Sequence, residues 1–161
     1  MIFELSDNTK KQIDYWLKKY PADQRRSAVV ASLLLAQEQN DGHLSEAAMK
    51  AVSDYLKISP IEVYEVATFY DQYNLKPIGK HKICVCTNIS CMLRGSERIV
   101  NYLEDRLKIK MGETTSDGKF TLQEVECMAA CGGAPMCQVD DKNYHENLTP
   151  EKMGRLLDDL L

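Results

Sequence analysis

The sequence of 161 residues predicts an α+β protein with two parts, a small helical bundle over residues 1–76 and an α/β layer over residues 77–161. Two observations lead to this division. Apolar residues recur every three to four positions in the first part but alternate in several segments of the second, as helices and strands respectively require. Between the two patterns, residues 75–80 read LKPIGK, and the proline and glycine are typical of a linker.

The first two helices are indicated by their caps and their spacing. Ser6 is a suitable N-cap for a segment with helical apolar spacing, which Pro21 ends. A second helix is expected over residues 24–40, with Gly42 beyond its end. The face that we expect it to bury carries Val30, Leu33, Leu34 and Gln37.

Two further helices follow in the first part. Ser45 is expected to begin the third helix. Residues 59–62 read SPIE, which combines an N-cap serine, a proline at the first helical position and a glutamate at the third. Four short helices with short connections predict a small bundle. The fourth helix is expected to pack through Val63, Val66, Ala67 and Tyr70.

The second part begins with a strand and continues with a helix. Residues 81–87, HKICVCT, alternate as a strand does. Residues 90–109 have the spacing of one helix, and residues 111–120 are expected to be a loop. Strands are then expected over residues 120–127, 135–141 and 143–147, before a last helix that opens at Thr149 and Pro150. The order β-α-β-β-β-α predicts an α/β layer of the thioredoxin kind.

Charge and hydropathy argue against a nucleic-acid partner and against direct membrane insertion. The net charge is −4 and basic residues are interspersed with acids, so no nucleic-acid partner is expected. The longest apolar stretch, residues 28–36, is far shorter than the ~20 residues that cross a bilayer, so direct membrane insertion is not expected either. The first residues carry acids where a signal peptide is basic. We therefore expect the chain to stay in a reducing compartment, where cysteines more often bind metals than form disulfides.

All six cysteines lie between Cys84 and Cys137. Two local pairs, Cys86-x4-Cys91 and Cys127-x3-Cys131, each follow a predicted strand. In a fold of this type neighbouring strands end at the same edge of the sheet, so the two loops can face one another and four thiolates can converge.

Three chemistries are candidates for this cysteine quartet. A dithiol enzyme requires C-x-x-C, which is missing. A zinc-stabilised interaction module stays an alternative, although structural zinc sites usually contain C-x2-C turns. A [2Fe–2S] cluster fits better, because its ligand loops are wider and C-x4-C occurs in plant-type ferredoxins. Cys84 and Cys137 are expected to be buried structural thiols, and pairing of Cys84 with Cys91 stays open.

Two glycines near the cysteines, and the absence of catalytic and nucleotide-binding motifs, favour an electron carrier. Gly132 and Gly133 either present amide hydrogens to the sulfides of such a cluster or simply turn the chain. No HExxH, GxGxxG or P-loop is present, and the three histidines are scattered. We therefore expect no catalytic residue and an electron carrier that works within a larger assembly.

Four segments of the sequence are specific enough to compare with known families: EVYEVATFYDQY, VCTNISCMLRGS, VECMAACGGAPMCQVDD and NLTPEKMGRLL. Together they resemble the thioredoxin-like [2Fe–2S] ferredoxin subunits of bacterial respiratory Complex I, an NADH-quinone oxidoreductase. The resemblance covers nearly the whole chain. Its specific signature is C-x4-C followed about 35 residues later by C-x3-C-x3-P. Family members have a helical N-terminal domain and a thioredoxin-like ferredoxin domain.

The resemblance implies that Cys86, Cys91, Cys127 and Cys131 bind a [2Fe–2S] cluster. It also implies that the chain docks on the flavin- and NADH-binding subunit and contacts further peripheral-arm subunits. The cluster would then lie near the FMN, on the side away from the main chain of electron carriers. The chain would then lie on the cytoplasmic side of the inner membrane through the complex, as a non-autonomous part of an enzyme. Pro135 is expected to be the cis proline that precedes a core strand in thioredoxin folds. The equivalent subunit of an NAD-linked hydrogenase or formate dehydrogenase is the near alternative.

Overall fold

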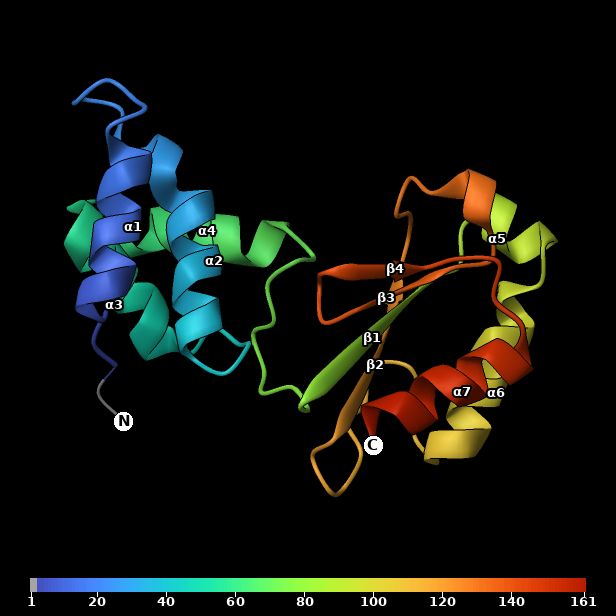
Figure 1. The fold of residues 1–161 in the computed structure, drawn as a ribbon. Helices are drawn as coiled ribbons and strands as arrows, with labels where there is room; N and C mark the ends of the chain where they lie inside the picture. The colour runs from blue at the N-terminus through green and yellow to red at the C-terminus, as the bar shows by residue number, and fades with distance from the viewer. Residues whose placement is uncertain (1–2) are drawn as a thin grey trace. The chain divides into compact units, whose positions relative to one another are not determined.

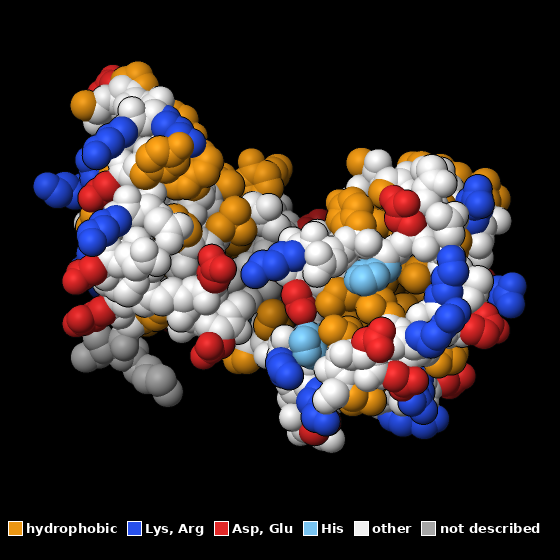
Figure 2. Space-filling view, viewed as in Figure 1, with side chains coloured by type: hydrophobic (Ala, Val, Ile, Leu, Met, Phe, Trp, Pro, Cys, Tyr) orange, Lys and Arg blue, Asp and Glu red, His pale blue; other side chains and the backbone are white. Residues whose placement is uncertain are grey.

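The computed structural model describes residues 3–161, and the chain divides into two compact units, Met1–Pro77 and Ile78–Leu161 (Figure 1). Each unit has a core of its own. On the face in Figure 2, basic and acidic side chains are interspersed over both units. In the part of the chain that the structure describes, none of the helices combines the length and the apolar character needed to cross a bilayer.

The first unit is helical, and its first, third and fourth helices begin where the sequence predicts, whereas the second begins at Val29 instead of residue 24. The Ser6 and Ser45 side chains accept hydrogen bonds from the third residue beyond them, Thr9 and Ala48. Glu62 Oε2 accepts from the Ser59 backbone N–H at 3.0 Å, as a capping box requires. The helices are α1 (Asp7–Leu17), α2 (Val29–Gln39), α3 (Glu46–Leu56) and α4 (Pro60–Phe69), with a 3₁₀ turn at Arg25–Ala28 before α2.

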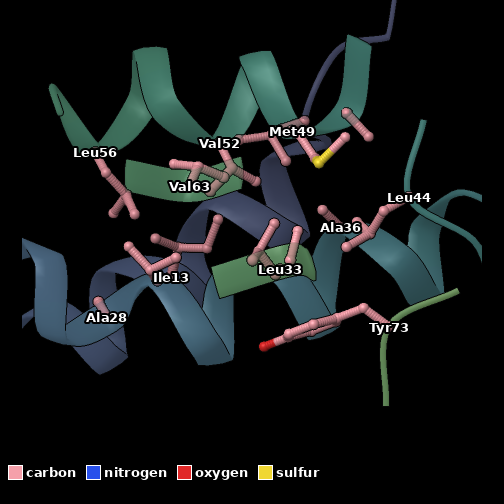
Figure 3. Close-up of a cluster of buried hydrophobic side chains, with 14 residues drawn as sticks. Ile13, Ala28, Leu33, Ala36, Leu44, Met49, Val52, Leu56, Val63 and Tyr73 are labelled. Carbon is pink, nitrogen blue, oxygen red and sulfur yellow. The ribbon is translucent and has the colours of Figure 1, made fainter. Parts of the chain in front are cut away.

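One buried cluster holds this unit together. Side chains from all four helices meet in it, including the fully buried Ile13, Leu33 and Val52 (Figure 3). The face predicted for α2 is partly wrong, because Val29 is buried where Val30 was expected and Leu34 is 40% exposed. The segment VVASLLLA is apolar almost all round, so its spacing does not select one face.

The prediction for Tyr70 in α4 is also wrong. Tyr70 follows the last residue of the helix, its backbone is extended, and its side chain is 43% exposed. It therefore does not continue the helical stripe of Val63 and Ala67, which are buried.

The second unit has the predicted order of strands and helices. Its elements are β1 (His81–Cys86), α5 (Ile89–Leu93), α6 (Ser96–Leu107), β2 (Phe120–Val125), β3 (Cys137–Val139), β4 (Asn143–His145) and α7 (Pro150–Leu160). The sheet order is β2-β1-β3-β4, with β1 parallel to β2 and the other pairs antiparallel. The single helix expected over residues 90–109 is instead two helices, α5 and α6. Gly95 separates them because its φ of 94° lies in the left-handed region.

The two faces of the sheet have different neighbours. Ile83 and Val85 of β1 pack in a buried cluster with residues of α6 and α7, which cover this face (Figure 1). Cys84 and Cys86 point to the other face and belong to a separate buried cluster with Met128, Ala134 and Met136. The cysteine face therefore lies opposite the two long helices.

Candidate functional site

Parallel pairing of β1 and β2 brings the two cysteine loops to one edge of the sheet. Cys86, the last residue of β1, is in register with Val125, the last residue of β2. The Thr87 N–H donates to the Val125 carbonyl at 3.3 Å. The chain segments that carry the four predicted ligands therefore leave the sheet side by side.

The first loop places two buried sulfurs. Cys86 ends β1, and Cys91 lies on α5. Asn88 caps this short helix, because its Oδ1 accepts from the Ile89 N–H at 2.7 Å and its carbonyl accepts from the Met92 N–H at 2.8 Å. The cap fixes the turn that returns Cys91 toward Cys86.

The second loop places two exposed cysteines. Cys127 Sγ accepts from the Ala129 N–H at 3.3 Å, and Ala129 has a left-handed backbone with φ of 56°. Cys131 begins a 3₁₀ turn, Cys131–Gly133, whose next residue, Ala134, donates its N–H to the Cys131 carbonyl. Both Cys127 and Cys131 are exposed to solvent.

All four predicted ligands line one cavity of about 350 Å³. Among residues 3–161, no group of three His, Cys, Asp or Glu side chains is gathered around a point that would suit a single metal ion. The cysteines surround the cavity instead, an arrangement compatible with a two-iron core in which each iron takes two protein sulfurs. The other lining residues are Asn88, Ile89, Ser90, Ala129, Ala130 and Met136.

Burial and the neighbouring thiols affect the protonation of Cys91. Burial raises the pKa of Cys91, and its hydrogen bond with Cys86 and repulsion from Cys86 and Cys131 raise it further, whereas a backbone hydrogen bond at Met136 lowers it. Sulfur ligands must be deprotonated to bind a metal, so iron would have to displace the proton. Four soft thiolate donors with a largely apolar lining fit an iron–sulfur cluster.

The two cysteines outside the predicted quartet, Cys84 and Cys137, are buried. Burial raises the pKa of Cys84 to about 11 and that of Cys137 to about 12, so both stay protonated at neutral pH. Cys137 is fully buried and packs beneath α6 and α7, on the other side of the sheet from Cys84. Neither lines the cavity.

The two glycines of the second loop differ. The Gly133 N–H donates to the Ala130 carbonyl at 3.0 Å, and the Gly133 carbonyl accepts from the Asn147 N–H at 2.6 Å. The hypothesis that Gly133 presents its amide to sulfide is therefore wrong, since the turn uses that amide. For the exposed Gly132 it stays a prediction.

Gly133 is also where a larger residue does not fit. A Cβ at this position would overlap the Glu146 side chain, whereas a Cβ at Gly132 meets no atom within 4 Å. We expect Gly133→Ala to lower the free energy of unfolding by about 1 kcal/mol, since the exposed Glu146 can move aside only in part. Urea titration measures this loss. Glu146→Ala should restore most of it in the double variant, and an equal loss with and without Glu146 would contradict the steric explanation.

The predicted cis proline is confirmed. The Ala134–Pro135 peptide bond is cis, and Pro135 precedes β3. The Pro135 carbonyl accepts from the Leu148 N–H at 2.9 Å, which connects the second cysteine loop to the start of α7.

Sequence reasoning missed Met136 and Asn88 as residues that line the cavity. Two loops distant in sequence form this cavity, so its lining residues share no local sequence pattern.

Comparisons with known proteins show the family of this chain. The family model for thioredoxin-like [2Fe-2S] ferredoxins matches residues 13–161. The E subunit of the NADH-quinone oxidoreductase of Rickettsia conorii is 49% identical over 144 residues, which cover 89% of this chain and 86% of the relative. The Rickettsia bellii protein of the same name is 48% identical with the same coverage.

Solved structures show the same fold. A chain of the NAD+-reducing [NiFe]-hydrogenase in the air-oxidized state superposes with a TM-score of 0.68 at 20% identity. The match covers 80% of this chain but spans only 22% of the hydrogenase chain.

Proposed function

This chain belongs to the thioredoxin-like [2Fe-2S] ferredoxin family, and on that premise we propose that it is the electron-transfer subunit of an NADH-quinone oxidoreductase. We further propose that Cys86, Cys91, Cys127 and Cys131 hold its cluster. The observation that carries this proposal is the lining of one cavity by all four side chains, which come from two loops at the same edge of the sheet.

The residues of the site have different tasks in this proposal. A bound [2Fe–2S] cluster supplies one-electron chemistry. Cys86 and Cys91 are 4% and 2% exposed and close the inner side of the cavity, which keeps water away. Cys127 and Cys131 are exposed and form the outer side, where a redox partner can approach. The chain is then an electron carrier that acts only as part of the enzyme, with NADH and flavin held by a partner.

An apolar surface next to the cavity supports the presence of such a partner. Ile89, Met92 and Leu93 of α5 are 66%, 54% and 77% exposed, and Ile89 also lines the cavity. Figure 2 shows hydrophobic side chains along the edge where Figure 1 places α5. Contiguous exposed apolar residues mark protein interfaces. We propose that the flavin- and NADH-binding subunit covers this α5 patch.

Two further features of the assembly belong to the same proposal. Further subunits of the peripheral arm would contact the chain, and the complex would hold it on the cytoplasmic side of the inner membrane. The near alternative, a subunit of an NAD-linked hydrogenase or formate dehydrogenase, is supported by the shared fold alone, since the hydrogenase is 20% identical. The relatives at 48–49% identity favour the quinone enzyme.

Metal and sulfide analysis of the full chain, purified without oxygen, tests the proposal. We expect two iron atoms and two acid-labile sulfides per chain, and a rhombic EPR signal after reduction with dithionite. A colourless protein that contains zinc and gives no such signal would support the interaction module instead. Co-purification with a flavin subunit, rather than with a hydrogenase or formate dehydrogenase subunit, distinguishes the oxidoreductases.

The role of the α5 patch in binding the flavin subunit can be tested separately. Leu93→Asp should weaken binding of the flavin subunit about tenfold, because a charged side chain must be desolvated in the interface, and leave the iron content unchanged. The affinity can be measured by biolayer interferometry with the separately purified partner. Leu161→Asp is the matched control, since Leu161 is 66% exposed and lines a different groove. Unchanged affinity in Leu93→Asp, or an equal loss in the control, would remove α5 from the interface.

A further inference from the structure

A buried charge lies on the same sheet face as the proposed ligand Cys86. The Lys82 side chain on β1 is only 2% exposed, and its Nζ lies 2.8 Å from Asp141 Oδ2. Asp141 is in the turn between β3 and β4, and its side chain is 45% exposed. Lysine is almost never fully buried unless it is paired. A well-packed apolar residue usually gives similar stability at such a position, so stability alone does not account for the lysine.

Strand geometry connects this lysine with the cluster site. Successive side chains of a strand point to opposite faces, so Lys82, Cys84 and Cys86 share one face of β1. At about 3.3 Å per residue, the Cα atoms of Lys82 and Cys86 are about 13 Å apart along the strand. Cys84 lies between them, and all three residues are buried.

The turn between β3 and β4 places two carboxylates, those of Asp140 and Asp141, close to Lys82. Asp140 is itself engaged, because its carboxylate accepts from the Lys82 backbone N–H and contacts His81 Nδ1 at 2.9 Å. The buried ammonium group of Lys82 and these carboxylates are therefore charged groups close to this strand.

We propose that Lys82 and Asp141 set the reduction potential of the cluster, with effects of opposite sign. The inference rests on the proposed function. One-electron reduction adds one negative charge to the site. A buried ammonium group stabilises that charge and raises the potential, whereas the carboxylate opposes it. Both side chains act on the cluster electrostatically through space, and neither is a ligand.

Burial is what gives Lys82 this effect. Charges interact more strongly in the protein interior than through water, and salt screens those at the surface. Lys80, two residues earlier, has the same formal charge but is exposed. It therefore provides a control with the same change in net charge.

Redox titration of the cluster-loaded full chain, followed by EPR with dithionite as reductant, tests the proposal. Lys82→Met keeps the length and the apolar stem but removes the charge, and should lower the midpoint potential. Asp141→Asn should raise it. Asp141 has φ of 56°, a conformation that asparagine tolerates, so this variant keeps the turn. Lys80→Met should leave the potential unchanged.

The pattern of shifts across the three variants decides the outcome. Opposite shifts for Lys82→Met and Asp141→Asn with no shift in the control support the proposal, and any other pattern overturns it. Should Lys82→Met fail to fold, the comparison of Asp141→Asn with wild type and with Lys80→Met decides alone. A purely structural role would change melting temperature or iron content in both variants without shifts of opposite sign. Absence of a reducible cluster in the wild-type chain would overturn the proposed function instead.

Discussion

Replacement of Cys127 by serine is expected to remove nearly all iron and acid-labile sulfide from the purified chain, whereas replacement of Cys137 leaves both in place. Cys127 is one of four sulfurs around the cavity. A serine hydroxyl does not ionise at neutral pH and is a poor ligand for iron, so three sulfurs would remain for a core that needs four. Visible absorption, iron assay and sulfide assay measure the loss.

The spare thiol is the matched control. Cys137 is fully buried under α6 and α7 and does not line the cavity. A buried hydroxyl costs about 1–3 kcal/mol, so Cys137→Ala should accompany Cys137→Ser to separate lost stability from lost ligation. Equal loss of iron from the Cys127 and Cys137 variants would show that the ligand assignment is wrong. Cys84→Ala should also retain the cluster, and that result would exclude the pairing of Cys84 with Cys91 as ligands.

Gly79→Ala is expected to lower the free energy of unfolding of the second unit by about 1–3 kcal/mol. A Cβ on Gly79 would lie 2.9 Å from backbone atoms of Lys119 and Phe120, where β2 begins. Backbone atoms do not change rotamer, so the added methyl group must push the start of β1 away from β2. It would also strain the hydrogen bond from the Gly79 N–H to Thr121 Oγ1, which is 2.7 Å long.

Denaturant titration under anaerobic conditions measures this change, with Gly132→Ala as the control. A Cβ at Gly132 has no neighbour within 4 Å, and we expect a change below about 0.5 kcal/mol. The same loss in both variants would mean that the contact with β2 is not its cause, since the lower entropy of the unfolded chain after Gly→Ala by itself favours folding. Unchanged stability in Gly79→Ala would mean that the strand edge adapts without cost.

Local patterns in the sequence predicted much of the fold. The caps at Ser6, Ser45 and Ser59 act on the next few residues, so they are visible in any short window. The errors arise where a local pattern allows two answers. The left-handed backbone at Gly95 interrupts a spacing that otherwise continues as one helix, and the first part of α2 is apolar almost all round, so its spacing does not select one face.

The sequence by itself determined the chemistry of this protein: the number and spacing of its cysteines, the alternation that places Cys84 and Cys86 on one strand face, and the resemblance that indicates the cluster. Tertiary structure alone decided the rest. It placed Cys86 in register with Val125, divided the sulfurs into buried and exposed pairs, and buried Lys82 beside Asp141. The reason is physical: capping and alternation involve neighbours along the chain, whereas strand register and burial depend on contacts between residues distant in sequence.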